Sequence, residues 1–312
     1  MTAALHQVQE RALRLGATIY YRSLRAAGVV AVKRRLRNAG LILCYHNVVA
    51  DEDRAGDPGL HMRRERFESQ MRWLSAHYDV LSLRELIDRL VAGGSLRATA
   101  AITFDDGYAG VFEHAVPILD ALGLPATVFI VAEAPGRWPG FWWDQPEAAG
   151  AVEPTTRDRW LIELRGDGEA ILAGDTLRAR RGLPAAYRPA DWATIRARVG
   201  GHIGVGVHSA THRSLPTLTD EELEREVVTS RAMLHRAVGI WPEFFAYPYG
   251  HWDPRVRAFV LSAGYRAGLT LDAGLNDAPD DLWCLRRVNI SAAISDAAFQ
   301  AWAVGLQGWR RD

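Results

Sequence analysis

The chain has 312 residues, 48% hydrophobic and 24% charged, which is typical of a folded globular protein. Its 37 basic and 37 acidic residues cancel, so it lacks the one-signed charge of a dedicated nucleic-acid-binding protein, and we expect no nucleic-acid partner. Two cysteines, Cys44 and Cys284, cannot build a disulfide framework and do not have the spacing of a zinc-thiolate site.

The first 39 residues form a basic arm, which we expect to be helical. Residues 1–40 carry eight Arg or Lys side chains against Glu10 alone, a net charge of +7, so the remainder carries −7. Two interpretations stay open: an arm packed against the following domain, or one that contacts anionic lipid at the membrane surface. No apolar run is long enough for a signal sequence or a membrane span. We therefore expect a cytoplasmic protein, either free or peripheral at the inner membrane surface.

From residue 40 onward, short apolar runs alternate with amphipathic segments. Such alternation predicts parallel strands joined by crossover helices, and about seven core strands indicate an α/β barrel of the TIM type. The expected strands are 40–46, 78–82, 99–104, 125–132, 203–209, 243–250, 265–271 and 284–290, and the expected helices are 64–77, 83–93, 111–123, 191–200, 220–239, 254–264 and 296–306. The pattern is interrupted by residues 136–190, a Trp-rich insertion that we expect to hold one helix near 157–164. One domain, 40–312, thus follows the arm.

The stretch "ITFDDGYAG" places Asp105 and Asp106 side by side directly after an apolar run. Adjacent buried carboxylates raise each other's pKa, so they cost stability unless a cation or a catalytic task uses them. The stretch "HSATH" places His208 and His212 four residues apart after another expected strand. Each pattern alone is most often a solvated turn or a coincidence. Together, at strand ends where a barrel gathers its active site, they predict a metal bound by two imidazoles and one carboxylate.

In such a site the second aspartate remains free beside the ligands. A carboxylate in that position can take the proton of a water molecule that the metal has made more acidic. The residues therefore predict hydrolysis, without yet assigning a separate role to each aspartate.

Three segments, "TFDDGY", "HSATH" and "YPYG", resemble the first three motifs of the polysaccharide deacetylases, carbohydrate esterase family four, also called the nodulation-deacetylase homology domain. "LGLPATVFIVA" and "FWWD" are similar to the bacterial surface-polysaccharide branch of this family, and the resemblance runs from about Leu41 to Ile290. It implies a distorted seven-stranded barrel that removes an N-acetyl group from an amino sugar with one divalent metal ion. By this resemblance, Asp105 is the general base, the metal ligands are Asp106, His208 and His212, and the backbone N–H of Tyr249 is an oxyanion donor. Zinc is the first expectation for the metal, with Co, Mn, Ni and Fe left open.

The sequence departs from the family pattern at two places. The third motif often carries an arginine that orients the base, and here Ala246 stands at that position. We expect Arg287, at the end of the last strand, to hold Asp105 instead. The late Leu-x-His motif that supplies the general acid is missing, which leaves His46 and His251 as substitutes. We favour His46, because it ends a core strand and so faces the mouth of the barrel.

Aromatic and polar residues near these motifs are candidates for binding the substrate. Sugars stack on indole faces, so Trp142 or Trp143 can line a groove, although both can equally belong to the core. Asp144 either contacts a sugar or caps a helix. The substrate-binding residues that we expect are therefore Trp142, Trp143, Asp144, Tyr247 and His251.

The function that follows is metal-dependent N-deacetylation of an amino sugar in a polysaccharide, a glycolipid or one of their precursors. A carbohydrate that carries an N-acetyl group is thus the expected partner. Two alternatives stay open: a deformylase or deacylase with the same chemistry, and an inactive carbohydrate-binding barrel. The intact carboxylate and imidazole set argues against the inactive barrel, because a binding module does not need a paired base and metal site.

Overall fold

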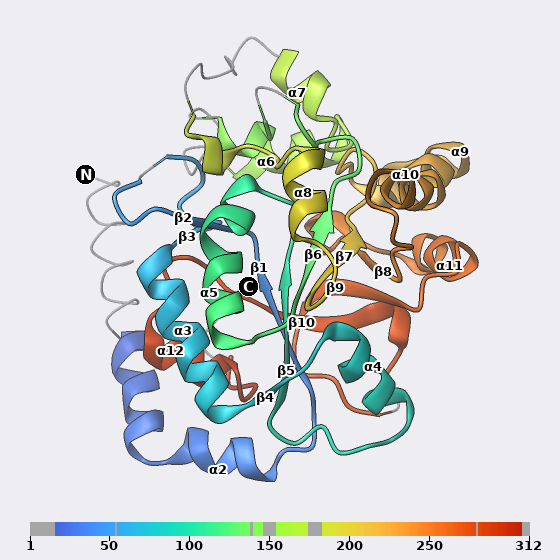
Figure 1. Ribbon diagram of the computed structural model, residues 1–312. Coiled ribbons are helices and arrows are strands. Elements are labelled where there is room, and N and C mark those ends of the chain that lie inside the picture. Colours follow the sequence, from blue (N-terminus) through green and yellow to red (C-terminus); the bar gives the residue numbers. More distant parts are fainter. Residues whose placement is uncertain are drawn as a thin grey trace.

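The computed structural model describes residues 16–53, 55–137, 140–145, 154–173, 183–278 and 280–307. Within them, seven parallel strands close into a barrel surrounded by helices (Figure 1), as the alternating pattern predicts. The barrel closes because β1 pairs with both β5 and β10. In order around the ring, the strands are β1 (Leu41–Tyr45), β5 (Thr99–Phe104), β6 (Ala126–Ile130), β7 (Ile203–Val207), β8 (Phe244–Ala246), β9 (Ala267–Ala273) and β10 (Leu285–Asn289).

Among the described residues, three further short strands lie outside this ring. The strand expected at 78–82 is reduced to β4 (Asp79–Val80), which pairs only with the first residues of β5, whereas β6 pairs with the last ones. The barrel is therefore a seven-stranded variant of the eight-stranded type. A second, unexpected sheet joins β2 (Asn47–Val49) to β3 (His61–Arg63). It follows β1 directly and lies beside the insertion, because β2 also contacts the short helical turn Ala185–Tyr187.

The helices cover the outside of the barrel and stack on its apolar strands. A Ser82–Glu85 capping box begins α4, whose buried leucines and isoleucine recur at helical spacing. A π-helical turn, Val111–Ala115, leads into α5, and another, Glu224–Thr229, joins α9 to α10. The helices are α2 (Val29–Leu36), α3 (Arg64–His77), α4 (Leu83–Val91), α5 (Val116–Leu122), α6 (Pro154–Ile162), α7 (Gly168–Ala173), α8 (Trp192–Arg198), α9 (Asp220–Leu223), α10 (Ser230–Val238), α11 (Pro254–Ser262) and α12 (Asp296–Trp302).

The core lies on both faces of the strands. All six residues of β5 are buried, as a parallel strand with both faces covered requires. Because side chains alternate along a strand, one set packs under the helices and the other fills the barrel. The second set includes Ile42, Ala101, Phe129, Ala246, Leu269 and Leu285.

The described part of the N-terminal arm, residues 16–39, packs against the barrel domain. Residues 16–26 are helical, as is α2, and Tyr21 and Val30 are 3% and 4% exposed within the main core. The indole of Trp302 in α12 donates a hydrogen bond to the Tyr21 hydroxyl at 3.0 Å. The described helices include none that is long and apolar enough to span a membrane.

The insertion, in its described parts, lies at the end of the barrel toward which the strand arrows point (Figure 1). It contains two described helices, α6 and α7, where the sequence predicts one. In the same view α2 lies at the opposite end of the molecule. The insertion therefore stands over the carboxyl ends of the strands, where the predicted site residues are found.

Candidate metal centre and active site

Asp105 and Asp106 form the turn that follows β5. Their side chains are only 1% and 2% exposed. Asp106 has a φ of +70°, a left-handed conformation that is strained for a residue other than glycine and that often occurs at functional sites. Gly107 follows with a φ of +78°, and a Cβ there would lie 2.7 Å from the Ile130 side chain, so only glycine fits. The turn thus buries two like-charged groups at considerable cost.

Asp106, His208 and His212 bring three ligand atoms together. Asp106 Oδ1 lies 3.5 Å from His208 Nε2 and 3.4 Å from His212 Nε2, and the two Nε2 atoms are 3.2 Å apart. A tetrahedral ion with bonds of about 2.0–2.1 Å needs ligand separations of about 3.4 Å. Asp106 Oδ1 is buried without a hydrogen-bond partner, which is unfavourable unless something else binds it. The three residues therefore fit a divalent cation.

The surrounding backbone orients the two imidazoles. His208 Nδ1 lies 2.8 Å from the carbonyl oxygen of Ala246. A carbonyl only accepts, so Nδ1 carries the proton and Nε2 presents its lone pair to Asp106 and His212. The backbone N–H of His212 donates to Ser209 Oγ at 2.9 Å. His212 and Ser209 both have positive φ, +63° and +62°. The loop between β7 and α9 is thus strained at His212, one of the three candidate ligands.

The electrostatics of the three ligands also fit a cation. Burial lowers the pKa of His208 and His212, and both imidazoles are therefore neutral, the form that binds metal. Burial raises the pKa of Asp106 well above its ordinary value, and the charges of Asp105 and Asp144 raise it further. A divalent cation would offset that repulsion.

Asp105 is held by Arg287 from β10. The guanidinium donates to both carboxylate oxygens at 2.7 Å, and its Nε donates to the Thr270 carbonyl at 2.8 Å. Arg287 is fully buried, whereas its neighbour Arg286 is exposed, as strand alternation predicts. Burial raises the pKa of Asp105, but the charge and the hydrogen bonds of Arg287 outweigh it and hold that pKa well below its usual range. Asp105 is therefore ionised.

Cys44 and His46 also lie close to Asp105. Cys44 Sγ donates to Asp105 Oδ2 at 3.4 Å, and one ligand atom from each of the three residues lies within 4.8 Å of the others. The Arg287 guanidinium already neutralises Asp105, so this trio is a poor site for a second cation. Burial lowers the pKa of His46 to about 4, so its imidazole is neutral near pH 7.

Tyr249 contacts the candidate ligand His212, whereas the side chains of Tyr247 and His251 bond to groups outside the candidate ligands. It has a φ of +58°, and its ring lies 4.5 Å, centroid to centroid, from the ring of His212. The Tyr247 side chain is fully buried and donates to the Trp283 carbonyl at 2.8 Å, so the structure does not bring it to the site as the sequence-based expectation required. His251 is exposed and lies 3.3 Å from Ser214 Oγ, at the rim.

The turn Trp142–Asp144 of the insertion covers His212. The Trp143 ring lies 4.5 Å from the ring of His212, and the Trp142 indole donates to the Tyr249 hydroxyl at 3.3 Å. Asp144 is 1% exposed, and its oxygens are taken up within the protein rather than left to bind a sugar. These oxygens accept from Tyr108 at 2.6 Å and contact His61 at 2.6 Å.

Sequence reasoning missed several residues that support the site. Tyr108 and His61 hold the Trp142–Asp144 turn, and Glu226 accepts the N–H groups of Ala210 and Thr211 at 2.9 Å, which fixes the loop before His212. Glu226 lies 14 residues beyond His212 in a continuous helical pattern. No local signal separates it from its solvated neighbours.

A cavity of about 340 Å³ opens between the insertion and the loop of His212. Its walls combine aromatic and charged side chains, and Trp143 lies between this cavity and His212. The lining includes Trp142, Trp143, Thr211, Arg213, Glu133 and Arg137. A space of this size and mixed character is typical of small-ligand sites.

Solved structures with the same fold come from bacterial deacetylases. The structure of IcaB from Ammonifex degensii superposes with a TM-score of 0.60 at 21% identity, covering 86% of this chain and 98% of that one. The polysaccharide deacetylase BC0361 from Bacillus cereus gives a TM-score of 0.59 at 20% identity, covering 85% and 69%. At these identities the likeness establishes the fold.

Two curated relatives extend the comparison to sequence. Putative polysaccharide deacetylase YxkH of Bacillus subtilis is 21% identical over 268 residues, 85% of this chain and 76% of the relative. The poly-β-1,6-N-acetyl-D-glucosamine N-deacetylase of Escherichia coli K12 is 25% identical over 257 residues, which cover 77% of this chain and only 35% of that protein. This chain thus spans about a third of the longer relative.

The sequence model of the family "Polysaccharide deacetylase" matches residues 93–268, more than half of the chain. That span includes the paired aspartates, both histidines and Tyr249, the residues that the barrel gathers at its carboxyl end. The seven-stranded barrel, the clustered motifs and this match lead to one conclusion: the chain belongs to the polysaccharide deacetylase family.

Proposed function

We propose that the protein is a metal-dependent hydrolase that removes N-acetyl groups from amino sugars of a polysaccharide, a glycolipid or their precursors. One observation carries the proposal: three ligand atoms of Asp106, His208 and His212 lie 3.2–3.5 Å apart beside an aspartate that Arg287 holds ionised. A binding module gains nothing from burying such a set. Zinc is the first candidate for the metal, since neutral imidazoles and a carboxylate suit it.

The residues around the ligands divide the chemistry between them. A divalent metal ion supplies Lewis-acid activation of the amide and of water when bound. In the proposal, Asp105 accepts the proton of the attacking water, and the backbone N–H of Tyr249 donates to the oxygen on which charge develops. Because Arg287 keeps the pKa of Asp105 low, the carboxyl readily gives up the proton that it has accepted.

Proton donation to the leaving amine falls to His46. Its imidazole lies in one cluster with Asp105, whereas His251 is exposed at the rim. Since the pKa of His46 is lowered to about 4, it is neutral before turnover. It therefore acts as a relay, receiving the proton that Asp105 has taken from water and passing it to the amine.

We assign sugar binding to the cavity of about 340 Å³ and to its indole walls, Trp142 and Trp143. The relatives in Escherichia coli and Staphylococcus aureus are named as poly-β-1,6-N-acetyl-D-glucosamine N-deacetylases, which makes β-1,6-linked N-acetylglucosamine oligomers the first substrate to test. Chitin oligomers come next, since chitin deacetylases match over shorter segments.

The experiment measures acetate and free amine released from these oligomers by protein loaded with zinc, cobalt, manganese, nickel or iron. N-formylated and N-acetylated versions of one oligomer distinguish a deformylase from a deacetylase. We expect acetate release that a chelator abolishes and that Asp105→Asn lacks. Metal binding without hydrolysis of any N-acyl sugar would contradict the proposal and favour a carbohydrate-binding barrel.

For the basic arm we propose a peripheral contact with anionic lipid. Its exposed apolar side chains lie among arginines and lysine, a combination that favours such surfaces. They are Ile19, Tyr20, Val32 and Leu36. Because α2 lies opposite the insertion (Figure 1), lipid contact would tether the protein while the strand ends face away from the bilayer.

A further inference from the structure

A sharp turn of the insertion, Arg165–Gly166, rests on the loop that carries His212. The carbonyl oxygen of Arg165 accepts a hydrogen bond from the Ser214 N–H at 2.8 Å. Arg165 has a φ of +55° and Gly166 one of +68°, so both adopt the left-handed conformation after α6. This conformation strains Arg165, whereas it would not strain a glycine. Backbone strain of this kind persists where other interactions stabilise it, which points to the contacts of the arginine side chain.

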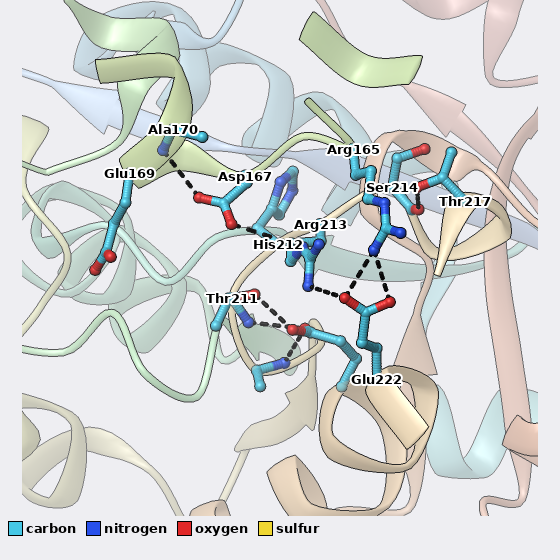
Figure 2. Close-up of polar contacts among 12 residues, drawn as sticks. Arg165, Asp167, Glu169, Ala170, Thr211, His212, Arg213, Ser214, Thr217 and Glu222 are labelled. Atoms are coloured by element: carbon cyan, nitrogen blue, oxygen red, sulfur yellow. Dashed lines mark hydrogen bonds and ion pairs between the residues drawn. The ribbon is translucent and has the colours of Figure 1, made fainter. Parts of the chain in front are cut away.

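The Arg165 side chain binds Glu222 in α9. One guanidinium nitrogen donates to both carboxylate oxygens at 2.8 Å. Arg213, the residue after His212, donates to the same carboxylate at 3.0 Å (Figure 2). Glu222 thus joins an arginine of the insertion to an arginine of the ligand loop. Arg213 also forms an ion pair with Asp167 of the insertion, with 3.9 Å between its Nε and Oδ2 of Asp167.

Gly166 extends the same contact to Tyr249. A Cβ on Gly166 would lie 3.1 Å from the Ser214 nitrogen and 3.2 Å from the Tyr249 ring. The turn therefore touches both the loop of His212 and the residue that we assign as oxyanion donor. These two elements come from different strand ends, and the turn fixes their separation.

We propose that Glu222, bound by Arg165 and Arg213, is a positioning residue that holds the insertion on the loop of His212 and so fixes His212 and Tyr249. Glu222 itself contacts neither of them. Glu222 also completes the capping box of α9, since its carboxylate accepts a hydrogen bond from the Thr219 N–H. We call Arg165, Glu222 and Arg213 the clamp, and its central carboxylate is therefore held at a helix terminus. The inference deepens the proposed function and rests on it for the roles of His212 and Tyr249.

The first test uses Glu222→Gln, which removes the charge but keeps an oxygen for the capping box. Arg165→Ala removes the other side, Arg165→Lys keeps a positive charge on a shorter side chain, and Glu221→Gln is the matched control at the exposed neighbouring position. Zinc-loaded proteins are mixed with a chromogenic chelator. We expect zinc release about 10- to 100-fold faster in Glu222→Gln and Arg165→Ala, partial rescue in Arg165→Lys, and no change in the control.

The second test needs no metal and no substrate. Hydrogen exchange of the Ser214 amide reports its bond to the Arg165 carbonyl in the metal-free protein. We expect faster exchange at residues 212–214 in Glu222→Gln and Arg165→Ala, and no further increase in the double variant, because both changes open one clamp. Additive effects, or exchange equal to that of the control, would overturn the proposal.

The kinetic test separates positioning from a general loss of stability. With the substrate found above, kcat should fall while KM changes little, and Arg165→Lys should recover part of kcat at an unchanged Tm. If the loss of activity among the variants simply follows their loss of Tm, the clamp stabilises the fold and does not position the site. Wild-type protein that binds no divalent metal would refute the proposed function. Wild-type protein that binds metal, with variants whose zinc release and amide exchange equal those of the wild type, would overturn only the clamp.

Discussion

Arg287 grips Asp105 through two parallel hydrogen bonds of 2.7 Å, and both side chains are shielded from solvent. The pair joins β10 to the end of β5 inside the barrel. A guanidinium that engages both oxygens fixes the plane of the carboxylate as well as its charge. The orientation of the proposed base is thus set by a strand nearly two hundred residues away, through the pair at positions 105 and 287.

Arg287→Ala should shift the acidic limb of the kcat/KM profile to higher pH. Arg287 holds the pKa of Asp105 below its usual range, and without it burial raises that pKa. The base must be ionised, so activity should fall at a higher pH than in the wild type. Arg286→Ala, at the exposed neighbouring position, is the control. An acidic limb that does not move would exclude the pairing as the cause.

The same variant should lose about 3–5 kcal/mol of unfolding free energy at neutral pH, because a buried carboxylate is left unpaired. A lowered carboxyl pKa stabilises the fold above the ordinary aspartate pKa, and that contribution disappears as pH falls through the lower native value. The difference between wild type and variant should therefore shrink on acidification. Urea unfolding at several pH values measures it.

The two aspartates should separate metal binding from turnover. Asp106→Ala should lose both, since its Oδ1 is one of the three converging atoms. Asp105→Asn should retain the metal and lose about 10²- to 10⁴-fold in kcat, the usual worth of a general base. Metal analysis and acetate release on the same samples decide the matter. The reverse pattern would exchange the two assignments.

His46→Ala should lower amide hydrolysis by about 10²-fold without loss of metal. An ester needs less help from a proton donor and should suffer far less. His251→Ala, at the rim, is the comparison and should remain near normal. Equal damage to ester and amide, or a crippled His251→Ala, would move the role away from His46.

His46 should also influence acid stability. Its pKa is lowered from 6.5 to about 4 by burial, so the unfolded state binds the proton more tightly and stability is lost as pH falls below 6.5. His46→Ala should therefore lose less stability than the wild type between pH 6.5 and 4. A parallel pH dependence in the two proteins would show that the pKa of His46 is not lowered in the folded state.

The N-terminal arm should contribute both to the stability of the fold and to binding of anionic lipid. Tyr21→Ala should cost about 3 kcal/mol of unfolding free energy, since Tyr21 is buried in the core. Replacing exposed Val32 and Leu36 by aspartate should leave stability nearly unchanged and weaken salt-sensitive binding to anionic vesicles. Wild-type protein that ignores such vesicles would leave the arm with its packing role alone.

The sequence by itself determined the barrel class and the central motifs. Alternating apolar and amphipathic segments dictate parallel strands with crossover helices, and residues at strand ends must then meet at one end of the barrel. Asp105, Asp106 and His208 could be found in this way because they directly follow apolar runs, and His212 because it stands four residues after His208. Arg287 could be found because strand alternation distinguishes it from exposed Arg286.

Only the tertiary structure decided which side chains support that centre. Tyr247 directly follows β8 and precedes Tyr249 by two residues, yet its side chain donates to the Trp283 carbonyl, because rotamer and packing are not encoded in spacing. The clamp of Arg165 and Glu222 joins an irregular insertion to a helix cap, and no periodicity relates two such positions. Local hydrophobic patterns determine which residues stand at the end of a strand. Contacts between an irregular segment and a helix terminus follow no such pattern, so they depend on how the whole chain folds.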